Sequence, residues 1–451
     1  MQTLVIGSLD LDITKACNCR CKYCYLSKGP RGDDYRGSDS MSRETMLDGI
    51  ELLKKFGVKP SRENRNQRLH LTFYGGEPML AWTNIVWFIE QCDAAGLNLR
   101  YTIVSNGTIG TPEIVDFCRK RNIFVQRSID GCPEAQEITR PGTIKRYEEQ
   151  TKLWRDYQHT RRVTVTPETV KYLAQSYEYF RKQGFALGGS PMLSFYEDWT
   201  PEALAILDEE FWKLARAYVA DAKRGRWWYI YWISRETVGR FWTGSRLGCG
   251  SGKQLWCLSW DGHLYTCHRF SSDSHDSPHC FGSAKDILAG TARGISESVQ
   301  ASMEKTWKNE RPFAECEWCV AREGCDAGCY HVNEILTGDP RTPPAVYCHM
   351  QRLSARIVSW MDRQLRPLDV HWWARGNFRA KEYLRIVEKH GHRQCLPPSP
   401  PETMRCEQEC PRNLNRSIGN CFLQAGPYQP MTLVGGTEDV MLAPDCRPVP
   451  C

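Results

Sequence analysis

The sequence predicts an α/β fold, a partial (β/α)6 barrel followed by a small cysteine-rich domain. From residue 9 to about residue 193, short β-rich runs alternate with helical stretches, as in parallel βαβ units. After residue 248 helical periodicity fades and cysteines accumulate. Six β-rich runs are fewer than the eight strands of a complete barrel, so we expect an open side that admits a large substrate.

The expected strands are residues 9–14, 69–74, 100–104, 123–129, 162–166 and 185–195. The helix before the second strand shows its period in Met46, Ile50 and Leu53, which share one face. Thr166 followed by proline is typical of a helix N-terminus. In such a fold the active groups lie where the strands end.

The rest of the chain changes character several times. We expect helix over 202–239 and again over 354–390, while 10 of the 25 prolines fall in the last 61 residues and predict an extended or disordered tail. The expected domains are a barrel (1–200), a helical linker (201–247), a cysteine-rich domain (248–350), a C-terminal helix (351–390) and the tail (391–451).

The composition of the chain narrows the classes of binding partner that we expect. Lys and Arg total 59 against 53 Asp and Glu, a balance too mild to predict a nucleic-acid or membrane partner. No apolar run is long enough to span a membrane, and residues 1–10 lack a signal-peptide pattern, so we expect a cytoplasmic protein. In a reducing compartment, 22 cysteines indicate metal ligands or catalytic thiols before disulfides.

The first cysteine cluster follows the first strand. Cys17, Cys21 and Cys24 are separated by three and then two residues, and the aromatic Tyr23 precedes the third. In a loop at the end of a first βα-unit strand, this pattern resembles the radical S-adenosylmethionine (radical SAM) enzymes. The alternatives are a zinc loop or a disulfide loop. Cys19 occupies a position that is commonly apolar in that family and is expected to be a packed thiol.

The resemblance implies a 4Fe-4S cluster with one iron open. Three thiolates hold three irons, and the fourth binds the amine and carboxylate of SAM. An electron from the cluster then cleaves SAM to methionine and a 5′-deoxyadenosyl radical, which takes a hydrogen atom from an unactivated carbon. Tyr23 is expected near the adenine.

Three later segments extend the resemblance. Gly75, Gly76 and Glu77 match the GGEP motif that receives the SAM amino group. Polar groups recur after the third and fourth strands, and by resemblance Asn106 supports the SAM pocket while Ser128 and Arg140 contact the SAM carboxylate or ribose. Asn106 and Asp130 could equally be turn caps.

The second cysteine set resembles the SPASM extension of radical SAM peptide maturases. Its pattern is a cysteine, Gly-x4-Cys, Cys-x2-Cys-x5-Cys-x3-Cys and a final cysteine, and every element is present in order. By resemblance, one auxiliary 4Fe-4S cluster takes Cys249, Cys257, Cys267 and Cys329, and the other takes Cys316, Cys319, Cys325 and Cys348. The chain would then hold three 4Fe-4S clusters. A pair of zinc sites is the alternative.

Two branches of the SPASM enzymes suggest different reactions for this chain. One oxidises a sulfatase Cys or Ser to formylglycine, and the short segment before Cys17 favours it. The other modifies peptides by crosslink or thioether formation. Sulfatase maturases generally carry Asp as the base directly after the Gly-x4-Cys cysteine, whereas this chain has His268, and they often carry Gln where it has Tyr74.

We therefore expect a peptide or protein maturase, with formylglycine formation as the runner-up. His268 is a candidate base or a structural residue. The resemblance also implies a flavodoxin- or ferredoxin-type electron donor. A cluster-bearing electron-transfer or binding protein without SAM chemistry is a third possibility, which the intact Gly75-Gly76-Glu77 disfavours.

Overall fold

The computed structural model of the chain has two compact units. The residues that it describes are 4–28, 37–59, 68–155, 157, 159–183, 192–227, 250–307, 313–322, 325–368, 372, 405–406 and 421–422. One unit comprises Met1–Arg162 with Cys249–Lys308, and the other comprises Val163–Gly248 with Asn309–Cys451. Among the described residues, no helix is both long and apolar enough to cross a membrane.

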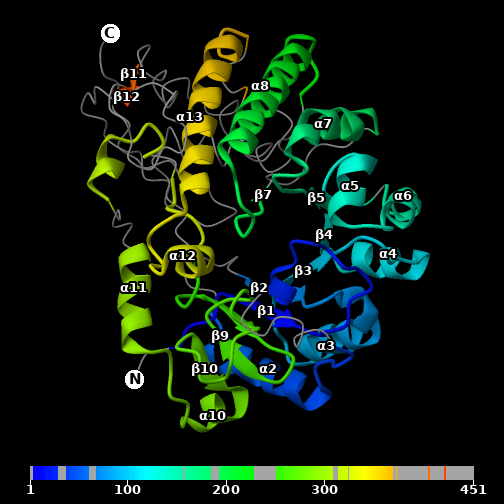
Figure 1. The fold of residues 1–451 in the computed structure, drawn as a ribbon. Coiled ribbons are helices and arrows are strands. Elements are labelled where there is room, and N and C mark those ends of the chain that lie inside the picture. The colour runs from blue at the N-terminus through cyan, green and yellow to red at the C-terminus, as the bar shows by residue number, and fades with distance from the viewer. Residues whose placement is uncertain are drawn as a thin grey trace, which may run out of the picture. The chain divides into compact units, whose positions relative to one another are not determined.

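The first unit is built on an eight-stranded sheet in the order β10-β9-β8-β1-β2-β3-β4-β5 (Figure 1). Five neighbouring strands run parallel: β1 (Ser8–Asp12), β2 (Leu69–Tyr74), β3 (Leu99–Ser105), β4 (Phe124–Ser128) and β5 (His159–Arg162). Their carboxyl ends share one edge, where the predicted site residues lie. The predicted α/β fold class is confirmed.

On its other side β1 pairs with a strand from far along the chain. β8 (Leu255–Leu258) runs parallel to β1, with Asp10 opposite Cys257. β9 (His263–Tyr265) and β10 (Cys280–Ser283) then continue the sheet in antiparallel sense. Trp256, Cys257 and Leu258 are fully buried, as expected of a central strand. The start of the cysteine-rich region is thus part of the barrel sheet, which the sequence analysis did not anticipate.

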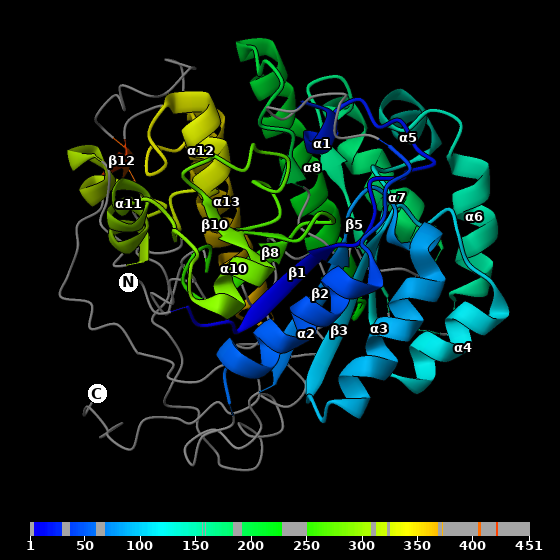
Figure 2. The ribbon, with the colours of Figure 1, turned by 90° about the horizontal axis from the view of Figure 1, so that it is seen from below.

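Helices flank this sheet, and α2, α3 and α4 follow one another on the same side of β1–β4 (Figure 2). They are α1 (Tyr25–Lys28), α2 (Arg43–Phe56), α3 (Trp82–Ala94), α4 (Pro112–Lys120), α5 (Pro133–Thr139), α6 (Ile144–Leu153), α10 (Ala284–Ala289) and α11 (Glu297–Trp307), with the 3-10 turn η2 (Pro78–Ala81). The predicted face of α2 is confirmed, because Met46, Ile50 and Leu53 are buried.

The second unit is mainly helical. Its elements are the strand pair β6 (Thr164–Val165) and β7 (Met192–Leu193), the turns η3 (Val170–Tyr172) and η4 (Ala314–Trp318), and the helices α7 (Leu173–Lys182), α8 (Pro201–Lys223), α12 (Tyr330–Thr337) and α13 (Ala345–Leu365). The α8 and α13 helices pack together, with the rings of Trp212 and Trp360 5.5 Å apart.

Element boundaries depart from the predictions at four places. The single strand expected over 162–166 is two strands, because β5 ends at Arg162 and β6 begins at Thr164. Of the strand expected over 185–195, only β7 lies within the described residues. The helix expected over 202–239 is α8, which ends at Lys223; 224–227 are not helical and 228–249 lie outside the described part. The helix expected over 354–390 runs from Ala345 to Leu365, and it begins directly after a proline that suits a helix start. In the tail, the described residues form β11 (Arg405–Cys406) and β12 (Cys421–Phe422).

Arg127 on β4 is a fully buried charge that ties the sheet to α6. Its guanidinium donates to the carbonyls of Gly107 and Tyr147, both at 3.1 Å, and lies over the Tyr147 ring. Burial lowers the pKa of Arg127. The loop after β3 and the start of α6 are thereby fixed against β4.

We expect Arg127→Met to lower the thermal midpoint of the protein markedly. Methionine fills the volume but leaves the buried Gly107 carbonyl without the Arg127 donor, at about 1–3 kcal/mol, and leaves the Tyr147 carbonyl with Thr151 Oγ1 as its side-chain donor. Arg119→Met on α4 is the matched control, since Arg119 is half-exposed and its ion pair with Asp116 is a surface contact. Equal midpoints for the two variants would contradict this role of Arg127.

Candidate active site

The loop after β1 carries the three predicted cluster thiols. Cys17 is exposed and Cys21 and Cys24 are half-buried, whereas Cys19 is buried. The Cys19 amide donates to Cys17 Sγ at 3.4 Å, and the Cys24 amide donates to the Cys21 carbonyl at 3.2 Å. Burial raises the pKa of Cys21 to about 11, and nearby Arg140 opposes that shift. The loop therefore presents three thiols at its surface and packs the fourth inside.

The glycine turn after β2 lies directly against this loop. The Gly76 amide donates to the Thr14 carbonyl and the Glu77 amide to the Ala16 carbonyl, both at 2.8 Å. A Cβ on Gly75 would lie 2.3 Å from the Thr14 oxygen, and one on Gly76 would lie 2.3 Å from the Ala16 oxygen. Gly75 also has φ +127°, which L side chains rarely adopt. Only glycines allow this approach of the two backbones.

The Glu77 carboxylate is fully buried and bound by the protein itself. Oε1 accepts from the Met79 amide at 3.0 Å and from Ser105 Oγ at 2.9 Å, while Oε2 accepts from the Asn106 amide at 2.6 Å. Burial raises its pKa to about 7, although these hydrogen bonds oppose the rise. The side chain thus joins the end of β2 to the end of β3, and three of its acceptor positions are already used.

Asn106 continues the chain of contacts from β3 back to the thiol loop. Its Nδ2 donates to Asn18 Oδ1 at 2.7 Å, and its Oδ1 accepts from Thr108 Oγ1 at 2.7 Å. Asn18 Nδ2 in turn donates to Thr108 Oγ1 at 2.9 Å. Asn106 is therefore more than a local turn cap, because it holds the loop residue that follows Cys17.

The end of β4 binds the same loop through a buried ion pair. Asp130 accepts from Tyr23 Oη at 2.7 Å, from Arg140 Nε at 2.9 Å and from Thr139 Oγ1 at 2.7 Å. Arg140 also donates to Tyr23 Oη at 2.8 Å. Both partners of the ion pair are nearly inaccessible. The structure brings together Tyr23 and Arg140, and it adds Asp130, which sequence reasoning treated as a possible turn cap. Ser128 ends β4 nearby in the chain and is half-buried.

A second group of side chains surrounds His268. Its Nδ1 lies 2.8 Å from Asp10 Oδ2, its ring stacks on Tyr74 with centroids 4.3 Å apart, and Tyr25 meets it edge-on at 5.8 Å. Asp10 is on β1 and Tyr74 ends β2. Because a carboxylate can only accept, this contact selects the tautomer with the hydrogen on Nδ1, in which Nε2 is the acceptor nitrogen.

Asp10 was missed by the sequence analysis. The signal was present in Ser8–Asp12, where Asp10 and Asp12 alternate with Leu9 and Leu11 and so share one face of the strand. Both carboxylates are buried, and Asp12 accepts from Ser271 Oγ. Two buried acids on one strand indicate a polar interior at this point of the sheet.

The predicted auxiliary ligands fall in both units. In the first unit Cys257 lies on β8 and Cys267 follows β9, and both are buried. Burial raises the pKa of Cys257. Cys249 lies outside the described residues. The remaining five, all half-buried, belong to the second unit: Cys316, Cys319, Cys325, Cys329 and Cys348.

The residues present fit the implied cofactors. Three thiols on one partly exposed loop suit an iron–sulfur cluster with one iron unliganded by protein. Two glycines that exclude any side chain from the facing turn leave backbone polar groups at that loop. The fit therefore depends on the thiols of the loop and on the backbone of the glycine turn.

Comparison with known proteins agrees with this geometry. The model of the Radical SAM superfamily matches residues 11–180. The radical SAM cyclopropyl synthase TigE of Paramaledivibacter caminithermalis is 28% identical over 142 residues, which are 31% of this chain and 30% of that protein. A cysteine-type anaerobic sulfatase-maturating enzyme of Clostridium novyi is 24% identical over 180 residues, 38% of this chain and 46% of the enzyme. The chain thus covers less than half of either relative.

Solved structures share the fold over more of the chain. Native anSMEcpe with bound AdoMet is similar with a TM-score of 0.61 and 16% identity, covering 79% of this chain and 99% of that one. A histidine-tagged form of the same protein gives a TM-score of 0.63 at 17% identity, covering 85% and 99%. Residues 11–180 of this chain thus match the radical SAM superfamily, and the match includes the cysteine loop after β1.

Proposed function

We propose that this chain is a radical SAM/SPASM enzyme that reductively cleaves SAM and abstracts hydrogen from a peptide or protein side chain. The observation that carries the proposal is the thiol loop after β1, which is bound to the ends of β2, β3 and β4 by separate hydrogen-bond groups. A loop held from three sides keeps its thiols in a fixed relation to those strand ends.

In this proposal Cys17, Cys21 and Cys24 hold a 4Fe-4S cluster, and SAM binds beside the residues expected from the sequence: Tyr23, Gly75, Gly76, Glu77, Asn106, Ser128 and Arg140. Together the two cofactors supply the electron and the 5′-deoxyadenosyl radical. Glu77, Asp130 and Tyr23 position the loop. Arg140 pairs with Asp130, and its positive charge also acts on the nearby Cys21 thiol.

The two auxiliary 4Fe-4S clusters belong to the same proposal. One takes Cys316, Cys319, Cys325 and Cys348, where the segment is held by backbone hydrogen bonds from Cys319 to Cys316 and from Cys325 to Ala321. The other takes Cys249, Cys257, Cys267 and Cys329. Four thiolates each leave no open iron, which suits electron transfer from the substrate or a scaffold role.

His268 is the proposed base, with Asp10 as its positioning residue. Asp10 fixes the proton on Nδ1, and the Tyr74 ring restricts rotation of the imidazole. The basic Nε2 can then accept a proton from a substrate carbon or heteroatom as the radical is oxidised. A flavodoxin- or ferredoxin-type protein is the proposed electron donor.

The relatives favour a peptide or protein substrate and keep formylglycine formation as the second candidate. Both cysteine-type and serine-type sulfatase-maturating enzymes are among them, and the serine-type enzyme of Bacteroides thetaiotaomicron is 30% identical over 121 residues. Against that candidate, His268 and Tyr74 form one stacked pair where those enzymes generally have Asp and often Gln. We prefer another peptide modification, such as a crosslink or thioether.

Replacing Cys17, Cys21 and Cys24 together by Ala should abolish SAM cleavage. About eight of about twelve irons should remain after anaerobic reconstitution, because the other ligands lie elsewhere in the chain. Iron content and 5′-deoxyadenosine release are the measurements. Retained cleavage would refute the catalytic site, and eight or fewer irons in the unmodified protein would remove one auxiliary cluster.

Gly76→Ala should reduce SAM cleavage strongly, because the new Cβ collides with the Ala16 carbonyl and displaces the thiol loop. Gly96→Ala is the control for backbone strain without a collision: Gly96 lies in an exposed turn with φ +70°, so alanine strains that turn, but its Cβ meets nothing within 4 Å. Rates of 5′-deoxyadenosine formation are compared at equal iron content. If Gly76→Ala cleaves SAM as fast as Gly96→Ala, the close approach of the two backbones is not needed for catalysis.

His268→Ala should leave SAM cleavage largely intact and lower product formation by roughly 10² to 10⁴-fold, the usual cost of losing a general base. His70→Ala, at an exposed histidine of β2, is the matched control. His268→Asp separates the two candidate functions, because formylglycine formation on a Cys-x-Pro-x-Arg peptide should then appear or rise. Efficient conversion of that peptide by the unmodified enzyme would make the second candidate correct.

A further inference from the structure

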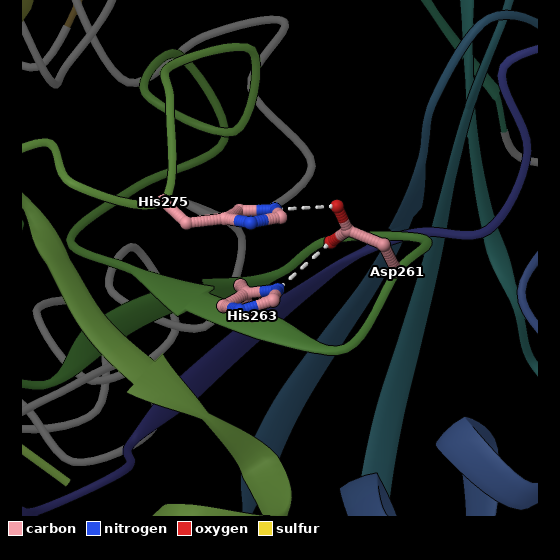
Figure 3. A group of neighbouring side chains, drawn as sticks. All are labelled: Asp261, His263 and His275. Carbon is pink, nitrogen blue, oxygen red and sulfur yellow. Dashed lines mark hydrogen bonds and ion pairs between the residues drawn. The ribbon is translucent and has the colours of Figure 1, made fainter.

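A histidine pair and one aspartate converge at the β8–β9 hairpin, apart from the residues assigned to SAM and to the clusters. His275 Nε2 lies 2.9 Å from Asp261 Oδ2, and His263 Nδ1 lies 3.4 Å from Asp261 Oδ1. The ligand atoms of all three residues fall within 4.8 Å of one another. Figure 3 shows both imidazoles directing a nitrogen toward the same carboxylate.

The backbone holds these side chains in place. Asp261 and His263 flank Gly262, whose φ of +88° makes the tight turn between β8 and β9. Ser259 Oγ donates to Asp261 and accepts from the His263 amide at 3.1 Å, which fixes the turn. The segment of His275 is held from outside, because one Arg293 nitrogen donates to the carbonyls of His275 and Ser277, both at 2.7 Å.

The charges suit a cation better than a simple ion pair. Burial opposes ionisation of Asp261, but hydrogen bonds from His263, Ser259 and His275 prevail and hold its pKa below the ordinary value, so the carboxylate is ionised. The two imidazoles stack with centroids 3.6 Å apart. This stacking places one nitrogen of each ring beside the same ionised carboxylate, which is the arrangement of donors that a cation requires.

We propose that Asp261, His263 and His275 form a binding site for a divalent transition-metal ion of the zinc type. Two imidazole nitrogens and one carboxylate are the donor set of many zinc and iron(II) sites, and three protein ligands leave positions for water. Ser259 is the outer partner that orients the carboxylate. His275 has a half-exposed side chain, which gives the ion an entry path.

Such an ion would fasten the loop between β9 and β10 to the β8–β9 turn. That loop carries Cys267 and His268 at one end and His275 further on. The metal replaces the two ring protons that now face Asp261, so binding releases protons or moves them to the other ring nitrogens. Binding should therefore weaken as the pH falls, because protons compete with the metal for the imidazole nitrogens.

The test is zinc binding to the cluster-loaded protein, measured by competition with a chromophoric chelator under anaerobic conditions. The unmodified protein should bind one zinc ion. In His275→Ala and in His263→Ala the dissociation constant for zinc should rise at least tenfold, because loss of an outer partner alone lowers metal affinity 10- to 100-fold. Asp276→Asn, at the exposed acid beside His275, is the matched control and should bind zinc unchanged.

Iron content and circular dichroism verify that each variant is folded and loaded. In crystals of the holoenzyme soaked with zinc, the anomalous difference peak should lie between the three side chains. The proposal is overturned if both histidine variants bind zinc as the unmodified protein does, or if the anomalous peak lies at cysteines instead. Either result would leave the triad as an ion pair only.

Discussion

The two hydrogen bonds from Gly76 and Glu77 to the backbone of Thr14 and Ala16 hold the thiol loop to the sheet. These hydrogen bonds require glycine at positions 75 and 76, since a Cβ at either position would overlap the carbonyl oxygen of Thr14 or Ala16. Because Glu77 then turns inward, its carboxylate reaches the end of β3 and accepts from Ser105 and Asn106. One short turn thereby sets the relation of three neighbouring strand ends, and the thiols inherit that relation.

The two buried acids around the loop differ in their partners. Glu77 accepts hydrogen bonds from neutral donors, and burial raises its pKa to about 7. Asp130 is also buried but has Arg140 at 2.9 Å. A buried pair of this kind contributes little net stability, yet removing one partner is costly, so it acts mainly to fix geometry. The geometry it fixes is that of Tyr23, next to Cys24.

Much of the fold followed from local sequence pattern, and the exceptions have a common cause. β2 was predicted with its observed bounds, Leu69–Tyr74, because it is a β-rich run that ends in a glycine turn. The place of β8 beside β1 depends on the pairing of Asp10 with Cys257, residues far apart in the chain, which no local pattern encodes. The thiols and glycines of the site were predicted because their chemistry needs fixed spacing. Asp10, Asp130 and the Asp261 triad were not, because their partners meet only in three dimensions.

The β8–β9 hairpin shows how one hairpin can serve several sites. Through β8 it brings Cys257 next to β1, and through the loop after β9 it brings His268 to Asp10 on that same strand. The backbone of Asp10 thus pairs with β8, while its carboxylate contacts the His268 imidazole. The turn of the hairpin carries Asp261 and His263, so anything bound there acts on the loop that delivers His268. Changes in this hairpin should consequently alter the proposed substrate step more than the proposed SAM cleavage, because the thiol loop is held by β2, β3 and β4 instead.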